Sequence, residues 1–479
     1  MPQPRKLVFT VASGLFLALA VAAERVKNSP VFSRSEISIA EAPPSHILSL
    51  SHNPRRNVLG SPARARIAHK LQQGQGPAPA VGTEAINTLF SGVYPVVNVT
   101  WGNRGPSPAG GGGNTTDGDG QQFISFVDTG SSDTWVATSA LQCVTMDQAR
   151  APLPQAACAF GPLYNVSLGS FQNITSAALS ISYYPEEEVL HGSVVTAPIT
   201  VAGITVPRQE AGLVDYAAWT GDGVSSGLLG LGYPSLTSAT NRAGGAASSR
   251  GPYDPWFTSA AKQGLVRDAV FTLALDRVPQ GQPNNATNVH AAAGLLAVGG
   301  LVPAAWYVAP FTSVPIEPTR PDRSGAPLSW YTTTHTFVYG PAGGAGARTT
   351  VGPYQSIVDT GTAANFVPTA AAAAVNAAFS PPARFNASLG YWTADCDATA
   401  PYAAFVIGGV EMPMDPRDMI FRGLNGLPGY ENLCFSVFAD GGDANEDAMI
   451  IGEVWQLSYV VAYDQGRSMM HFAKRSSQR

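Results

Sequence analysis

The sequence predicts an all-β protein with two lobes, and three observations lead to this class. At 479 residues the chain is too long for one small core and has the length of two. Hydrophobic residues make up 45% and charged residues only 13%, with 50 Gly and 38 Pro, which is typical of antiparallel strands joined by many turns. The tripeptide Asp-Thr-Gly also occurs once in each half, at 128–130 and 359–361.

The two tripeptides stand in matching surroundings, because each follows a short apolar run, at 123–127 and at 356–358. Average residue frequencies predict about 0.1 such tripeptides in a chain of this length, so two copies indicate a duplicated unit. Each copy is expected to place one carboxylate, that of Asp128 or Asp359, on a tight turn at the end of a buried strand. The threonine that follows is expected to form hydrogen bonds within its own turn.

This pair of carboxylates predicts hydrolytic chemistry. Two carboxyl groups brought face to face cannot both ionise easily, so they share one proton. One then acts as a base and the other as an acid, which is what the addition of water to an amide requires. Such a mechanism needs no cofactor and no metal. The alternative interpretation is two unrelated surface turns, since Asp and Gly are both common in turns.

Three further segments give these turns a recognisable context: Ser-Asp-Thr-Trp-Val at 132–136, Gly-Leu-Leu-Gly-Leu-Gly at 227–232 and Ile-Ile-Gly-Glu-Val-Trp at 450–455. With them the chain resembles the pepsin-like aspartic endopeptidases, most closely the secreted fungal type, from about residue 94 to about residue 472. The resemblance implies a bilobal pepsin-like double β-barrel or sandwich with an active-site cleft between the lobes. It implies that the last two segments thread behind the two turns, and that polypeptide substrates bind in extended form.

The resemblance also assigns roles to single residues. Asp128 and Asp359 would be the catalytic pair, and the residues that support them or form the flap over the substrate would be Gly130, Ser131, Gly361, Thr362, Trp135 and Tyr183. In this family Gly usually follows the flap tyrosine, whereas here Tyr184, Pro185 and three Glu follow, which leaves the choice between Tyr183 and Tyr184 open. The acidic tip suggests a preference for basic residues near the cut; the alternative is a solvated hairpin tip.

The four cysteines, an even number, predict disulfides and an oxidising compartment. Three pairings are possible, and both the duplicated plan and the resemblance favour one bridge in each lobe, Cys143 to Cys158 and Cys396 to Cys434. Free buried thiols are the alternative, and the spacings do not suggest zinc.

The N-terminal segment indicates export and latency. Arg5 and Lys6 precede an apolar stretch at 7–21 and a plausible cleavage site at 20–22, which predicts a signal peptide at 1–22 rather than a membrane anchor. Residues 24–82 hold eight Lys/Arg and three Asp/Glu, a net charge of +5, whereas residues 83–479 hold 18 and 30, a net charge of −12. We interpret 23–82 as an inhibitory propeptide that acid releases, with Lys70 as a possible plug; a disordered linker is the alternative.

The remaining features complete the expected organisation. The N-terminal lobe would span 83–305 and the C-terminal lobe 306–479, with short helices at 254–265 and 368–379. Six glycosylation sequons are present, at Asn98, Asn114, Asn165, Asn173, Asn285 and Asn386. The net charge of −5 and the low Lys content argue against nucleic-acid partners, and the C-terminus carries no apolar tail that would predict a lipid anchor.

Together these features predict a monomeric aspartic endopeptidase, made as a zymogen and active in acid, that is secreted or delivered to an acidic vacuole. Two other functions share part of this pattern. A glycosidase also uses paired carboxylates, but does not need them on duplicated turns. A catalytically inactive pepsin-like binding or inhibitor protein would be expected to have lost one carboxylate or a turn glycine, and both turns here are whole.

Overall fold

The computed structural model describes residues 39–52, 95–103, 120–183, 188–241, 251–277, 290–318, 328, 330–387, 390–421, 433–443 and 449–476. The predicted signal peptide, Lys70, Tyr184 and the acidic flap tip at 185–187 lie outside these residues. No helix in the described part of the chain is long and apolar enough to cross a membrane.

The largest sheet has 15 strands and combines the strands up to residue 315 with the last two strands of the chain. Its strands are β1 Ile47–His52, β2 Pro95–Trp101, β3 Gln121–Asp128, β4 Trp135–Val144, β5 Pro152–Leu153, β6 Gln172–Tyr183, β7 Glu188–Val201, β8 Ile204–Ala218, β9 Gly227–Gly230, β10 Ala239–Asn241, β11 Val270–Leu275, β12 His290–Val298, β13 Tyr307–Pro315, β25 Tyr459–Asp464 and β26 Met469–Arg475. They follow the order β10-β6-β7-β8-β4-β9-β3-β2-β1-β12-β11-β25-β26-β13, with β5 paired to β4.

The C-terminal half forms two smaller sheets. The seven-stranded sheet, in the order β20-β19-β14-β15-β24-β16-β23, consists of β14 Thr332–Ala342, β15 Thr349–Val358, β16 Asn365–Val367, β19 Pro401–Ile407, β20 Val410–Pro413, β23 Phe438–Asp440 and β24 Met449–Ile451. The four-stranded sheet consists of β17 Arg384–Asn386, β18 Tyr391–Asp395, β22 Leu433–Ser436 and β21 Ile420–Phe421.

Helices in the described residues are few and short. The α-helices are α4 Trp256–Lys262, α5 Thr369–Ala377 and α6 Glu453–Gln456, and the 3₁₀ helices are η1 Pro44–His46, η2 Gln155–Cys158, η3 Pro234–Leu236, η4 Ala304–Trp306 and η5 Pro416–Asp418. Helices α4 and α5 confirm the two helices expected at 254–265 and 368–379. Each begins directly after a proline, Pro255 or Pro368, whose fixed backbone angle marks the start of the helix.

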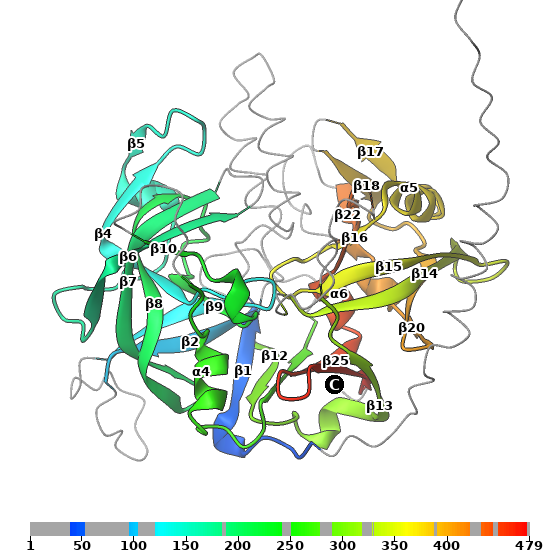
Figure 1. Cartoon of the computed structure of the whole chain (residues 1–479). Coiled ribbons are helices and arrows are strands. Elements are labelled where there is room, and N and C mark those ends of the chain that lie inside the picture. The colour runs from blue at the N-terminus through cyan, green and yellow to red at the C-terminus, as the bar shows by residue number, and fades with distance from the viewer. Residues whose placement is uncertain are drawn as a thin grey trace, which may run out of the picture.

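The molecule has the bilobal β architecture that the sequence predicts. Figure 1 shows β6, β7 and β8 on one side and β14, β15 and α5 on the other, with β1, β12, β25 and β13 beneath both. Strand β11 joins the two halves because it pairs with β12 along one edge and with the late strand β25 along the other. Each half also holds one predicted disulfide, Cys143–Cys158 and Cys396–Cys434, and no cysteine is free.

Part of the predicted propeptide belongs to this sheet. Strand β1 lies between β2 and β12 and pairs antiparallel with both. Just before it, Ile39 and Ala42 are buried in an apolar cluster with Val270 and Leu301. Residues 39–52 therefore contribute backbone pairing and apolar packing to the base of the molecule, which their basic, Pro- and Ser-rich surroundings do not predict.

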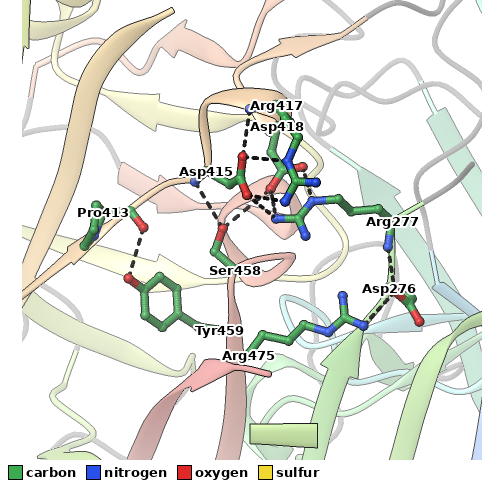
Figure 2. A network of polar contacts seen from close by, with 9 residues as sticks. All are labelled: Asp276, Arg277, Pro413, Asp415, Arg417, Asp418, Ser458, Tyr459 and Arg475. Atoms are coloured by element: carbon green, nitrogen blue, oxygen red, sulfur yellow. Dashed lines mark hydrogen bonds and ion pairs between the residues drawn. The ribbon is translucent and has the colours of Figure 1, made fainter. Parts of the chain in front are cut away.

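A polar network ties the two halves together close to this base (Figure 2). Arg277, just after β11, donates from Nε and Nη2 to the two carboxylate oxygens of Asp418, each at 2.7 Å, and from Nη2 to Asp415 at 3.2 Å. The neighbouring Asp276 accepts from Arg475 near the C-terminus at 2.6 Å. Ion pairs thus connect the end of β11 to the segment around Asp418 and to the C-terminal strand, both more than a hundred residues further along the chain.

Candidate active site

The two Asp-Thr-Gly turns follow buried strands that are supported in the same way. Strand β3 ends at Asp128, and β9 runs parallel to it in a register that pairs Asp128 with Gly230. Strand β15 ends at Val358, and β24 runs parallel to it in a register that pairs Val358 with Ile451. The segments 227–232 and 450–455 therefore pass behind the turns, as the resemblance implied.

The two threonines lock the turns together. The Thr129 amide donates to Thr360 Oγ1 at 3.2 Å, and the Thr360 amide donates to Thr129 Oγ1 at 3.0 Å. The hydroxyls then continue into the opposite strands, from Thr129 to the Val358 carbonyl at 3.1 Å and from Thr360 to the Val127 carbonyl at 2.9 Å. The expectation that each threonine bonds within its own turn was wrong: the bonds cross between the halves and fix the two turns face to face.

Each aspartate is held by two donors from its own turn. Asp128 accepts from the Gly130 amide at 2.8 Å and from the Ser131 hydroxyl at 2.6 Å. Asp359 accepts from the Gly361 amide at 2.7 Å and from the Thr362 hydroxyl at 2.7 Å. Residues 130, 131, 361 and 362 thus lie where the sequence predicts, and they fix the orientation of both carboxylates.

The turn glycines allow the two carboxylates to approach each other. A Cβ atom on Gly130 would lie only 2.7 Å from the carboxyl group of Asp359. A Cβ atom on Gly361 would lie closer still to Oδ1 of Asp128. Each carboxylate therefore packs over the glycine of the opposite turn, in space that any other residue would fill.

Burial and mutual proximity govern the charge of the pair. Both side chains are buried. Burial raises the pKa of Asp359 well above its ordinary value, and the adjacent Asp128 carboxyl group raises it further, although Thr362 and the Gly361 amide act in the opposite direction. Two carboxyl groups buried side by side are therefore expected to share one proton, which belongs to the pair as a unit.

The two residues predicted for the flap, Trp135 and Tyr183, form the hydrogen bond that the resemblance implied. Trp135 donates from Nε1 to the hydroxyl oxygen of Tyr183 at 3.0 Å, and Tyr183 is the last residue of β6. The ring of Trp219 lies 5.9 Å from that of Tyr183 and 5.7 Å from that of Trp135. These aromatic contacts hold the end of β6 next to the hairpin tip, while the role of Tyr184 and of the acidic tip remains a prediction.

Besides Trp219, three residues at the site were not expected from the sequence. Trp330 donates from Nε1 to the Gly130 carbonyl at 2.9 Å, and the Tyr331 hydroxyl donates to the Leu231 carbonyl at 2.6 Å. Both bonds reach from the start of the C-terminal half to the first turn and its supporting segment. Glu453 lies buried behind the second turn, and the only signal of it was a charged residue in the apolar run 450–455.

The described residues contain no group of three or more His, Cys, Asp or Glu side chains that could hold a metal ion. The site that they do contain consists of two buried carboxylates on turns that are hydrogen-bonded to each other, with oriented hydroxyl and amide donors.

Comparisons with known proteins bear directly on this arrangement. The family model described as eukaryotic aspartyl protease matches residues 116–475, which include both turns. A probable aspartic-type endopeptidase of Aspergillus fumigatus is 36% identical over 356 residues, covering 74% of this chain and 76% of the relative. Rhizopuspepsin of Rhizopus chinensis is 25% identical over 464 residues, covering 96% of this chain and 97% of the relative.

The fold has a solved counterpart as well. The crystal structure of an aspartic proteinase from Irpex lacteus superposes with a TM-score of 0.58, covering 81% of this chain and 96% of that chain at 20% sequence identity. At that identity the likeness speaks for the bilobal fold alone.

Proposed function

The chain belongs to the eukaryotic aspartyl protease family and is an aspartic-type endopeptidase, and from this premise we propose that Asp128 and Asp359 hydrolyse peptide bonds in acid by activating water. The observation that carries the proposal is the mutual packing of two buried carboxylates, each bonded within its own turn and set over the glycine of the other. That geometry forces the pair to share a proton, so it combines a base with an acid.

In the first step Asp128 acts as the general base. Water held between the two carboxylates gives one proton to Asp128 while its oxygen attacks the carbonyl carbon of the scissile peptide bond. Asp359 donates its own proton to the carbonyl oxygen, so the intermediate is a neutral gem-diol. Burial favours the protonated form of Asp359, which agrees with the role of acid that we propose for it.

In the second step the intermediate collapses. Asp128 passes the proton that it took from water to the amide nitrogen, and the C–N bond breaks. One hydroxyl group of the gem-diol returns its proton to Asp359 as the product carboxyl group forms. The pair ends as it began, so the cycle consumes one water and requires no covalent enzyme intermediate.

The surrounding residues hold the geometry during these transfers. Ser131 and Thr362 each donate to the Oδ2 atom of the aspartate in their own turn, and the crossed Thr129 and Thr360 bonds keep the two turns from separating. Such fixed positioning contributes to rate because the reacting groups need not reorganise during the reaction. Tyr183, oriented by Trp135, is proposed to close over the peptide from the flap side.

We further propose that the protein is exported and made as a zymogen. The apolar segment at 7–21 and the basic segment at 24–82 support this, as do two disulfides and exposed sequon asparagines at Asn98, Asn165 and Asn173. Acid would weaken the attraction between the basic leader and the acidic body by protonating carboxylates. Because residues 39–52 pair with the rest of the protein through β1, activation in acid must either release that strand or leave it in the sheet.

The test is digestion of a denatured protein at about pH 3–4, where one carboxylate of such a pair is protonated, by the full chain after acid treatment. The parent protein and Asp359→Asn are compared at equal concentration, with the mass of each measured before and after acid exposure. The parent should cleave and lose mass from its N-terminus, and Asp359→Asn should do neither unless parent enzyme is added. Cleavage by Asp359→Asn alone would contradict the proposed roles, and absence of cleavage by a processed parent would favour the inactive binding protein.

A further inference from the structure

Four aromatic rings gather next to the strands that support the first catalytic turn, and only two of them have a proposed role. Trp135 begins β4, which pairs with β9, and it donates to the hydroxyl oxygen of Tyr183. Trp219 lies against both of these side chains. The fourth ring is that of Phe160, which packs on the same apolar cluster and is partly exposed.

Phe160 contacts the other rings through a stacked pair. Its ring is nearly parallel to that of Trp219, with an angle of 6° between the planes and 5.8 Å between the centroids. The ring of Trp135 meets both of them edge-on, at 6.1 Å from Phe160 and at 5.7 Å from Trp219. Stacked and edge-to-face pairs at such distances are both favourable. Phe160 therefore restrains Trp219, which in turn contacts Tyr183 at 5.9 Å.

A disulfide holds the segment that carries Phe160. Cys158, two residues before it, is bonded to Cys143 near the end of β4, the strand that begins with Trp135. Between Cys158 and Phe160 the backbone of Ala159 is left-handed, with a φ of 47°. The position of Phe160 is thus set by a covalent link to the strand whose first residue it contacts.

The backbone on both sides of Phe160 is also hydrogen-bonded to the loop that follows Trp219. The Cys158 carbonyl accepts from the Gly221 amide at 2.9 Å. The Gly161 amide donates to the carbonyl of residue 225, also at 2.9 Å. A Cβ atom on Gly161 would overlap the carbonyl oxygen of residue 224, so the close approach requires glycine at this position. These contacts fix the two stacked rings relative to each other.

We propose that Phe160 is a positioning residue for Tyr183, which acts by holding Trp219 in the orientation that keeps the Tyr183 hydroxyl group on Trp135. This inference rests on the proposed role of Tyr183 in binding the substrate. A binding residue that is already ordered in the free protein loses less conformational entropy when a peptide binds, so the ordering increases the affinity for peptides. Phe160 produces this effect without touching the peptide.

The two carboxylates should not depend on Phe160. The donors that hold Asp128 and Asp359 come from their own turns. Loss of the Phe160 ring is therefore expected to change the binding of the substrate more than the chemical step. In kinetic terms the effect should fall on KM rather than on kcat.

A purely structural role makes a different prediction. If Phe160 only covered the apolar cluster, its loss would lower the free energy of unfolding and leave KM unchanged. The two roles also differ in their coupling to Tyr183. A residue that acts through Tyr183 has no further effect once the Tyr183 side chain is removed, so the two substitutions should not be additive.

The experiment measures kcat and KM in acid for the processed parent, Phe160→Ala, Tyr183→Ala and the double variant. The substrate is a synthetic peptide that spans one bond cleaved by the parent in a denatured protein. Phe160→Tyr keeps the stacked ring and tests for rescue. Phe171→Ala is the matched control, because Phe171 is also partly exposed but its ring lies against Tyr164, in a different apolar cluster. Urea unfolding verifies that each variant is folded.

We expect Phe160→Ala to raise KM by about 2- to 10-fold, which is the equilibrium equivalent of one aromatic contact, and to change kcat by less than about twofold. Phe160→Tyr should restore the KM of the parent, and Phe171→Ala should not change it. In the Tyr183→Ala background, Phe160→Ala should change KM by less than about twofold.

An unchanged KM in Phe160→Ala would overturn the inference, and so would an increase of the same size with and without the Tyr183 side chain. The proposed function is judged separately, by the parent alone. A processed parent that cleaves no peptide would overturn the proposed function and this inference with it, whereas a parent that cleaves while Phe160→Ala keeps its KM would overturn the inference alone.

Discussion

The substitution His335→Gln tests how the fold tolerates the acid in which the enzyme is proposed to work. His335 lies on β14 and is almost fully buried, with the rings of Tyr354 and Phe405 beside it. Its Nε2 shares a hydrogen bond of 2.7 Å with the Ser356 hydroxyl. Burial lowers the pKa of His335 from 6.5 to about 4, because the charged imidazolium would lose its solvation.

The magnitude follows from the two pKa values. Between pH 6.5 and pH 4 His335 takes up a proton in the unfolded chain but not in the folded chain. The free energy of unfolding therefore falls as the pH falls through this range. A difference of about 2.5 in pKa corresponds to about 3 kcal/mol of unfolding free energy, and the folded protein has lost this stability by pH 4. His335→Gln removes this loss, but it disturbs the bond to Ser356, at a cost of about 1 kcal/mol.

Plots of the free energy of unfolding against pH should therefore cross for His335→Gln and its parent. At pH 7 His335→Gln should be less stable than its parent by about 1 kcal/mol, and at pH 4 more stable by about 2 kcal/mol. Urea unfolding followed by tryptophan fluorescence measures both values. Ser356→Ala is the matched control, because it loses the hydrogen bond but keeps the imidazole, so its deficit should be the same at both pH values. A constant difference between His335→Gln and its parent across this range would refute the reasoning.

Two further predictions concern the turn glycines and the link between the halves. Gly361→Ala should lower kcat at least about 100-fold, because its methyl group would displace the Asp128 carboxylate, whereas Gly251→Ala, with open space around it, should keep full activity. Arg277→Gln should destabilise the fold by about 2–3 kcal/mol in urea unfolding, because it leaves the buried Asp418 carboxylate without its guanidinium partner. Arg417→Gln, at an exposed pair with Asp415, should cost under about 1 kcal/mol, and equal losses for the two arginines would contradict the assignment.

Much of the fold and site could be predicted because their signals are local. A few consecutive residues suffice to identify each Asp-Thr-Gly turn, each glycine-containing segment behind a turn, and each helix that begins after a proline. The disulfides followed from an even count and the duplicated plan, and both are present. The pairing of Trp135 with Tyr183 followed from the resemblance and is also present, at 3.0 Å.

The features that could not be predicted are contacts between distant parts of the chain. The crossed bonds of Thr129 and Thr360 join residues 231 positions apart, and a threonine that bonds across has the same local sequence as one that bonds within its turn. The Trp330 bond to Gly130 spans 200 positions and has no motif of its own. Strand β1 is short and sits in a basic segment, so only its pairing partners reveal it.

Glu453 is an intermediate case. Its charge in an apolar run is visible in the sequence, but a glutamate there could equally have pointed to solvent. Only the burial of the side chain, with both oxygens unpartnered among the described residues, distinguishes the two possibilities.

The central claim is that Asp128 and Asp359 act as one catalytic unit, and a double-mutant cycle tests it most directly. Rates of peptide cleavage in acid are measured for the parent, Asp128→Asn, Asp359→Asn and the double variant, with each folded sample verified by circular dichroism. Because either residue alone lacks the shared proton, each single substitution should abolish nearly as much activity as both together. Losses that simply multiply in the double variant, or a single variant that keeps most of its rate, would contradict the account.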